Sequence, residues 1–192
     1  MTGKKILLAI VAVSVLGLAA AIALSPYGKK EGFAYPLMKT SVEINATPDS
    51  VFRFLGNSDN ARRWSVFVNH IKPLNADSIK DGQPGARRRC FCKGDESGRR
   101  WDETITEMVP GKKRQLICYA FVDFPVSAQG LATEQLYQDL GNGKMRLTFT
   151  FFFKDRKPSL IESFCMYLSA YRVNDIFVRN MNNVKRLVET GT

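Results

Sequence analysis

The chain has 192 residues, of which 45% are hydrophobic and 11% aromatic, and it carries a formal net charge of +10. This composition supports a packed core and excludes a globally disordered protein. Acidic and basic residues are interspersed, and a moderate positive field of this kind suits an anionic lipid surface as well as nucleic acid. Since no nucleic-acid-binding motif occurs, we predict a membrane and no nucleic acid among the partners.

The N-terminal region contains one segment that is long and apolar enough to cross a membrane. After a tail at residues 1–5, residues 6–24 carry no charge, and lysine pairs flank them at 4–5 and 29–30. At 1.5 Å per residue this segment would span roughly 28 Å as a helix, which matches the hydrocarbon core of a bilayer. The sequence therefore predicts a single-pass transmembrane anchor.

A removable signal peptide is the alternative to a retained anchor. Ala21, Ile22 and Ala23 resemble a small-residue cleavage site, but the apolar part of a signal peptide usually has only about 7–15 residues. Because the lysines on the two sides are equal in number, the positive-inside rule determines the orientation weakly. A short tail with two lysines favours the cytoplasmic side, so we predict that the soluble domain is extracytoplasmic.

The remainder of the chain predicts a strand-rich domain after a short tether. Residues 25–36 contain two prolines and two glycines and are predicted to be the tether. Residues 37–46 alternate between apolar and polar side chains, as in a half-buried strand, and Thr47-Pro48 is typical of a helix start. A second short helix carries Trp64 and Phe67. Further strands are expected at 70–76, 86–93, 99–109, 112–122, 127–140 and 144–154.

A long amphipathic helix is predicted from Pro158 to Glu189, where apolar residues recur at helical spacing. An antiparallel sheet of about seven strands has one face to bury, and this helix is the only large element left to cover it. We therefore predict an α+β fold for residues 37–189, in which the sheet wraps around the helix and encloses an apolar space.

Several short motifs follow one another in an order that resembles a known family. They are the segment 46–52 (Ala-Thr-Pro-Asp-Ser-Val-Phe), Trp64, residues 103–107 with Pro110-Gly111-Lys112, and the turn at 141–144. Residues 37–189 thus resemble the START-like helix-grip (SRPBCC) superfamily, in its polyketide cyclase/dehydrase and lipid-transport branch. The resemblance implies a helix-grip fold. The family includes lipid binders, cyclases, hydratases and chaperone-regulating modules, so the resemblance does not fix the activity.

The final strand and the final helix supply the predicted ligand pocket. Strand alternation directs one set of side chains toward the helix, and helical spacing directs one stripe of the helix toward the strand. Asp175 interrupts this stripe and would orient a ligand if it faced inward, and a solvent-facing position is equally open. The bulky aromatic side chains could also simply fill the core. The pocket candidates are Met145, Leu147, Phe149, Phe151, Phe164, Leu168, Tyr171, Asp175 and Val178.

Five arginines flank one predicted hairpin and are candidates for contact with anionic lipid headgroups. They are Arg87, Arg88, Arg89, Arg99 and Arg100. A solvated hairpin face without a partner is the alternative for this cluster.

No set of residues compels catalysis. His70 is the only imidazole, and no nucleophile can be assigned to it. The four cysteines form no CxxC pair, so we predict buried, unlinked thiols, no metal site and no cofactor. The predicted function is membrane-anchored binding or transport of a hydrophobic, lipid-like ligand. The alternatives are a cyclase/dehydrase-type enzyme that uses a pocket carboxylate such as Asp175 or Glu103, and a ligand-free interaction module.

Overall fold

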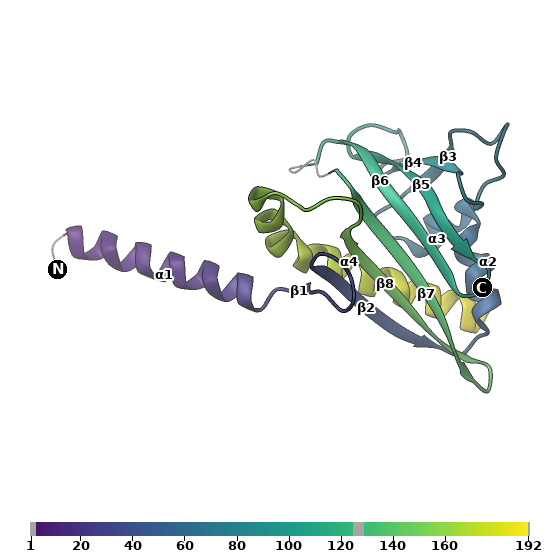
Figure 1. Ribbon diagram of the computed structural model, residues 1–192, viewed down its shortest axis with the longest axis horizontal. Coiled ribbons are helices and arrows are strands. Elements are labelled where there is room, and N and C mark those ends of the chain that lie inside the picture. The colour runs from purple at the N-terminus through teal and green to yellow at the C-terminus, as the bar shows by residue number, and fades with distance from the viewer. Residues whose placement is uncertain (1–2, 125–128, 192) are drawn as a thin grey trace.

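The computed structural model describes residues 3–124 and 129–191, and Figure 1 shows their arrangement. The helices are α1 (Gly3–Ala23), α2 (Pro48–Gly56), the 3-10 helix η1 (Ser58–Asn60), α3 (Ala61–Trp64) and α4 (Leu160–Thr190). The strands are β1 (Tyr27–Lys29), β2 (Leu37–Ile44), β3 (His70–Pro73), β4 (Arg87–Phe91), β5 (Arg100–Val109), β6 (Lys113–Val122), β7 (Leu131–Gly141) and β8 (Lys144–Phe153).

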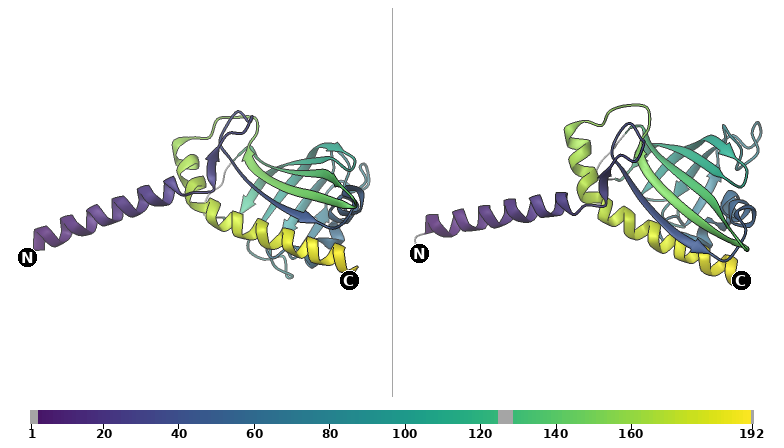
Figure 2. Two further views of the ribbon diagram at one scale, coloured as in Figure 1. Left: turned by 90° about the horizontal axis from the view of Figure 1, so that it is seen from below. Right: turned by 60° about the horizontal axis from the view of Figure 1, so that its bottom comes forward.

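The eight strands form one antiparallel sheet in the order β1-β2-β8-β7-β6-β5-β4-β3. The sheet is curled, and α4 runs along its concave side (Figure 2). This confirms the predicted α+β helix-grip architecture, with one strand more than expected. The strand expected over residues 127–140 begins at Leu131, and residues 127–128 lie outside the described part of the chain.

The additional strand, β1, lies in the segment predicted to be a tether. It has three residues, and its Tyr27 lies opposite Met38 of β2. A strand this short has no alternation that a sequence pattern can detect. The side chain of Tyr27 is nevertheless buried and packs edge-on against Tyr167 of α4, with 5.1 Å between the ring centroids. This part of the expected tether is therefore fixed to the domain.

The helix starts follow local sequence signals. Thr47 is the N-cap residue of α2 and Pro48 opens the helix, as predicted. α4 begins with a capping box, in which Glu162 N donates to Ser159 Oγ at 3.2 Å and Ser159 N donates to Glu162 Oε2 at 2.8 Å. α4 ends at Gly191, whose φ of 70° is the left-handed conformation that glycine adopts readily.

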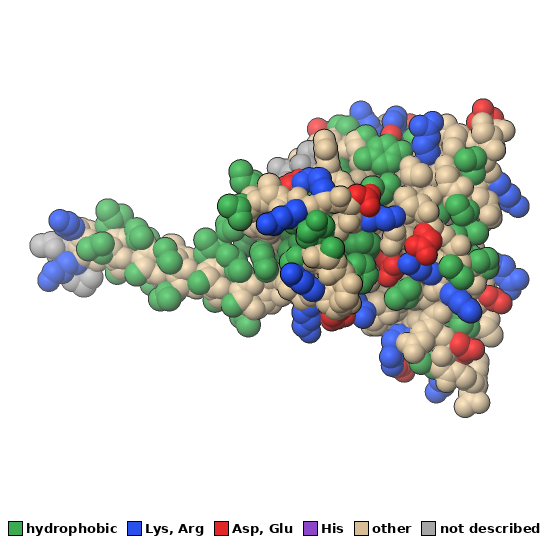
Figure 3. Space-filling view, viewed as in Figure 1, with side chains coloured by type: hydrophobic (Ala, Val, Ile, Leu, Met, Phe, Trp, Pro, Cys, Tyr) green, Lys and Arg blue, Asp and Glu red, His purple; other side chains and the backbone are tan. Residues whose placement is uncertain are grey.

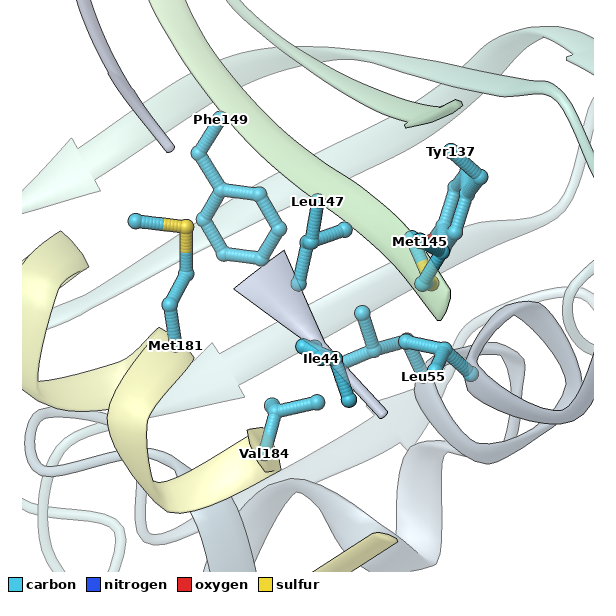
Figure 4. Close-up of a cluster of buried hydrophobic side chains, with 9 residues drawn as sticks. Ile44, Leu55, Tyr137, Met145, Leu147, Phe149, Met181 and Val184 are labelled. Carbon is cyan, nitrogen blue, oxygen red and sulfur yellow. The ribbon is translucent and has the colours of Figure 1, made fainter. Parts of the chain in front are cut away.

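The main hydrophobic core lies between α2, the β2–β8–β7 part of the sheet and the C-terminal half of α4 (Figure 4). Met145, Leu147 and Phe149 of β8 belong to it, because every second residue of a strand faces the same side. A second cluster nearer α1 includes Tyr27 and Phe153. The remaining interior, beneath β4 to β7, contains the cavity described below.

Within the described chain, α1 is the helix that is long and apolar enough to cross a membrane, a property that a signal sequence would share. None of its residues is buried, and only three residues separate it from β1. Two hydrogen bonds hold its C-terminal end to α4. Tyr171 Oη donates to the carbonyl oxygen of Ala21, and Ser25 Oγ donates to that of Tyr167, each at 2.7 Å.

Candidate functional site

A cavity of about 140 Å³ lies between the sheet, α3 and α4. An apolar cavity of about 150 Å³ accommodates a single aromatic ring, whereas drug-sized ligands occupy about 300–1,000 Å³. The space therefore suits a small ligand or one end of a longer one. Large apolar side chains make up much of the wall, namely Trp64, Phe67, Trp101, Phe149, Ile176 and Phe177.

A buried ion pair forms one polar end of the cavity. Arg88 of β4 and Glu103 of β5 are opposite each other in the sheet register, and both line the cavity. Arg88 Nε donates to Glu103 Oε1 at 2.7 Å, and Arg88 Nη1 donates to Ser58 Oγ at 3.3 Å. Burial alone would lower the pKa of Arg88, but the charges of Glu103 and, to a smaller extent, Asp81 raise it above its ordinary value. The guanidinium stays charged, and its planar donors suit an oxyanion or a carbonyl oxygen.

Two buried thiols flank Glu103. Cys90 follows Arg88 on the inner face of β4, and Cys118 of β6 lies opposite Glu103. Burial, followed by the charge of Glu103, raises the pKa of both thiols well above the ordinary value. A protonated thiol is a weak nucleophile; Cys90 lines the cavity, whereas Cys118 lies beside it. All four cysteines are free thiols; Cys90 and Cys118 are buried, as predicted, whereas Cys92 and Cys165 are only half-buried.

A second buried guanidinium, that of Arg114 on β6, connects the cavity wall to α2. Its Nη1 donates to Gln135 Oε1 at 3.2 Å and to Tyr137 Oη at 3.3 Å, and its Nη2 donates to the carbonyl oxygen of Phe52 at 3.3 Å. Burial lowers the pKa of Arg114, but an arginine in a protein remains protonated. Since Gln135 lines the cavity, Arg114 fixes the position of a cavity residue without lining the cavity itself.

The predicted pocket residues on β8 occupy three different environments. Phe149 belongs to the main core and also lines the cavity, whereas Met145 and Leu147 lie in the core away from the cavity. Phe151 is half-buried and packs against Phe177 of α4, with 6.2 Å between the ring centroids. Alternation thus identifies the inner face of the strand, but the neighbouring α2 determines which of its residues border a hollow.

The predicted pocket residues on α4 lie outside the cavity. Phe164, Leu168, Tyr171 and Val178 are exposed at the protein surface. The expectation and the structure differ because the first half of α4 is apolar on two sides, and helical spacing alone does not show which side packs on the sheet. The interior side of α4 carries Met166, Ala170, Ile176, Phe177, Asn180 and Met181.

Two polar candidates also lie away from the cavity. Asp175 is exposed and forms ion pairs with Arg172 and Arg179 of the same helix, at 3.3 and 3.6 Å. His70 stacks on the ring of Phe91, with 4.9 Å between the centroids. No group of histidine, cysteine and carboxylate side chains in the described residues could hold a metal ion.

The five candidate arginines do not form one exposed patch. Successive side chains of a strand point to opposite faces, so the run from Arg87 to Arg89 is divided between the two sides of the sheet. Arg88 is buried in the cavity wall, which excludes it from a headgroup site. Arg89 on the outer face donates two hydrogen bonds to Asp102, at 2.7 and 2.9 Å, so its charge is already neutralised. Arg87 is exposed.

Arg99 and Arg100 lie at the end of the sheet that α1 joins. Arg100 pairs with Val122 at the end of β6, and Leu37 at the start of β2 pairs with Phe152 near the end of β8. These strand ends share one side of an antiparallel sheet. Contact with anionic lipid therefore stays a prediction for Arg99 and Arg100. It also stays a prediction for the exposed Arg87, which pairs with Thr104 further along β5.

Of the two residues at the charged end of the cavity, Glu103 is predicted from the sequence as a candidate pocket carboxylate, whereas Arg88 is assigned to the membrane surface. Among the aromatic lining residues, only Phe149 is predicted as a pocket candidate. The alternation of side chains in β4 and β5 contains a pattern that could have identified the buried ion pair. The inner positions Arg88 and Cys90 of β4, and Trp101, Glu103 and Ile105 of β5, combine charged and apolar side chains on one face. One opposite pair of charges on an otherwise apolar face indicates a buried ion pair.

A curled antiparallel sheet around a long C-terminal helix, with a cavity between the two, defines a helix-grip protein. The sequence matches the family described as "Polyketide cyclase / dehydrase and lipid transport" over residues 36–189. The chain therefore belongs to this family. A search of the curated proteins found no match.

Solved structures share the fold at low sequence identity. Protein CV1439 from Chromobacterium violaceum is 15% identical with a TM-score of 0.55, and the match covers 80% of this chain and 97% of that one. A Thermobifida fusca protein is 15% identical with a TM-score of 0.60, covering 79% and 92%. The Aha1 dimer from Colwellia psychrerythraea is 16% identical with a TM-score of 0.57, covering 81% and 98%. At these identities the likeness shows the fold alone.

Proposed function

We propose that this chain is a membrane-anchored protein that binds a small hydrophobic, lipid-like ligand in its helix-grip cavity. The observation that carries the proposal is the cavity, which combines a mainly apolar wall that includes five aromatic side chains with a charged end at Arg88 and Glu103. Mostly apolar, concave sites with a few placed polar groups are typical of small-molecule binding. Membership of the family supports a hydrophobic ligand.

The lining favours a ligand with a flat apolar part and one polar head. The rings of Phe67 and Trp101 are stacked at a centroid distance of 5.8 Å, and they offer ring faces and edges to an aromatic or unsaturated group. A head with an acceptor oxygen would bind at Arg88. Because the volume is about 140 Å³, a longer tail would project out of the cavity or displace wall side chains.

α1 supports the membrane location. Its length and its exposed apolar side chains fit a hydrocarbon core, although a removable signal sequence remains the alternative. A hydrophobic ligand partitions into a bilayer, so a retained anchor would keep the cavity beside the reservoir of its ligand. The extracytoplasmic position of the domain stays a prediction.

A pair of substitutions on α4 tests ligand binding. Ile176 lines the cavity and Val178, two residues further along, is exposed. In Ile176→Trp the added ring occupies the cavity, whereas in Val178→Trp it extends into solvent. We expect that organic extraction and mass spectrometry of the purified full chain recover a small molecule from the wild type and from Val178→Trp but not from Ile176→Trp. Equal recovery from all three proteins would contradict the proposal.

A cyclase/dehydrase-type enzyme is the second candidate function, and the position of Glu103 in the cavity wall favours it. A carboxylate next to a bound ligand can act as an acid or base. If it does, the molecule extracted from Glu103→Gln should differ in mass from the one extracted from the wild type, for example by one water. An identical molecule in both proteins favours simple binding.

A further inference from the structure

The outer side of the first half of α4 is exposed and apolar. It consists of Leu160, Ile161, Phe164, Leu168 and Tyr171, whose exposed fractions are 90%, 74%, 41%, 39% and 43%. Most of the spacings between these residues are three or four, so they share one side of the helix. We name these five residues the α4 apolar face. A contiguous exposed patch of this kind usually marks a contact with another protein or with a membrane.

The same side of α4 becomes charged where this face ends. Asp175 lies one turn beyond Tyr171 and Arg179 one turn further, and the two are exposed and paired with each other at 3.6 Å. Arg172 is exposed as well. The change occurs at Tyr171, the residue that bonds to the last turn of α1. The apolar part of the outer side is therefore confined to the part of α4 nearest α1.

The α4 apolar face and α1 lie on the same side of the domain, and hydrophobic side chains gather around their junction (Figure 3). The hydroxyl of Tyr171 donates to the carbonyl oxygen of Ala21 at 2.7 Å. This carbonyl belongs to the last turn of α1, where helix carbonyls lack partners within the helix. Together with the bond from Ser25 to Tyr167, it fixes α4 directly beside the end of α1.

The first turns of α4 bend away from the rest of the helix and run across the direction of α1 (Figure 2). When α1 crosses a bilayer, a helix in this orientation lies along the membrane surface. Amphipathic helices bind the interface in the same orientation, with one apolar side immersed. Tyrosine is also enriched at this depth, because its ring is apolar and its hydroxyl is polar.

Exposed basic residues precede the α4 apolar face in the sequence or follow the end of α1, to which Tyr171 of this face is bonded. Lys157 lies three residues before Leu160, and Lys29 and Lys30 follow the end of α1 closely. Their positions suit contact with anionic headgroups around an immersed apolar patch. This combination of an apolar face with basic residues near its start and near the end of α1 favours lipid over a protein as the occupant.

We propose that the α4 apolar face is immersed in the interfacial region of the same bilayer that holds α1. The domain is then seated on the membrane in a fixed orientation instead of being suspended on a flexible tether. The inference rests on the proposed retention of α1 as an anchor. It adds to that function a second, separate contact between the domain and lipid.

Photocrosslinking of the full chain in proteoliposomes of mixed zwitterionic and anionic lipid tests this contact. p-Benzoylphenylalanine replaces Phe164 in one variant, Leu168 in a second and Leu140 in the control. The native side chains have similar exposed fractions of 41%, 39% and 37%. Leu140 is near the end of β7, beside the turn into β8 and at the sheet end away from α1. After irradiation we expect a several-fold larger fraction of lipid adducts at positions 164 and 168 than at 140.

Carbonate extraction of the same vesicles distinguishes a failure of the proposed anchor from a failure of the proposed seated orientation. A chain that stays in the membrane but yields equal lipid adducts at all three positions would overturn the seated orientation and leave the anchor intact. Release of the full chain into the soluble fraction would overturn the anchor and the seated orientation together. Adducts from position 164 to a second copy of the chain, in place of lipid, would also overturn the lipid contact.

Discussion

Replacing one member of the Arg88–Glu103 pair should destabilise the domain far more than replacing both. The two side chains are 7% and 10% exposed, so a guanidinium left without its carboxylate has little access to water. Removing one partner of a buried pair typically costs about 3–5 kcal/mol, whereas replacing the whole pair by apolar residues of similar volume is often neutral or stabilising. We therefore expect Glu103→Leu and Arg88→Met each to lose about 3–5 kcal/mol, and the double variant to lie within about 1 kcal/mol of the wild type.

Intrinsic fluorescence provides the assay for these variants. The only two tryptophans, Trp64 and Trp101, both line the cavity, so their emission reports on the structure around the pair. Denaturant titrations of the detergent-solubilised full chain give the free energy of unfolding for the wild type, the two single variants and the double variant. The four values form a double-mutant cycle, which isolates the interaction between Arg88 and Glu103 from the loss of either side chain alone.

Two outcomes would refute the reasoning. Single variants that lose less than about 1 kcal/mol would show that water reaches the pair, since exposed ion pairs contribute no more than that. A double variant as unstable as the sum of the two singles would show that the side chains act independently. A stable double variant can also be tested for ligand binding, since it folds but lacks the charged end of the cavity. Ligand recovery at the wild-type level would show that the charged end does not hold the head of the ligand.

Two other predictions concern acid stability and close packing. A hydrogen bond from Arg156 is the main cause that lowers the pKa of Glu162 from 4.5 to about 2. Its carboxylate therefore stabilises the fold above pH 4.5, and this contribution is lost as the pH falls toward 2. Thermal melts at pH 7 and pH 3 should show a smaller acid-induced shift for Glu162→Gln than for the wild type, and an unchanged shift would contradict the assignment. A Cβ on Gly56 would lie 2.7 Å from Nη2 of the buried Arg114, so Gly56→Ala should lose about 1–3 kcal/mol by overpacking. Gly94→Ala, whose nearest contact is at 3.6 Å, is the control that should stay close to the wild type.

The strand pattern of the sequence predicts the fold because most strands have one buried face. In β2 and β8 apolar and polar residues alternate along the sequence, and the register pairs Thr40 with Phe149 and Val42 with Leu147. The burial in β8 is less regular than its sequence, because Thr148, Thr150 and Phe152 on the other face are buried as well. Thr47 and Pro48 predict the start of α2 for the local reason that a helix start needs a cap and tolerates proline. Such features depend only on neighbours in the sequence.

The candidate site is harder to predict because it depends on neighbours in space. Arg88 lies within a run of three arginines and resembles a surface cluster, and only the position of Glu103 across the sheet explains its burial. Phe164 and Leu168 are as apolar as the core side of α4, but the side of the helix that meets the sheet is Met166 and Ala170. The spacing of apolar residues predicts that α4 is a helix, whereas the bend of α4 and its contact with α1 determine which side of the helix packs against the sheet.

Only a short stretch of α4 separates the proposed membrane contact from the cavity. Tyr171 bonds to the end of α1, and Ile176, five residues later, lines the cavity. At 1.5 Å per residue these positions are about 8 Å apart along the helix. If the α4 apolar face is immersed and α1 is retained, the wall of the cavity begins within about two helical turns of the bilayer surface. A lipid-like molecule would then travel only a short distance between membrane and cavity, which is the arrangement expected of a binder that exchanges its ligand with the membrane that anchors it.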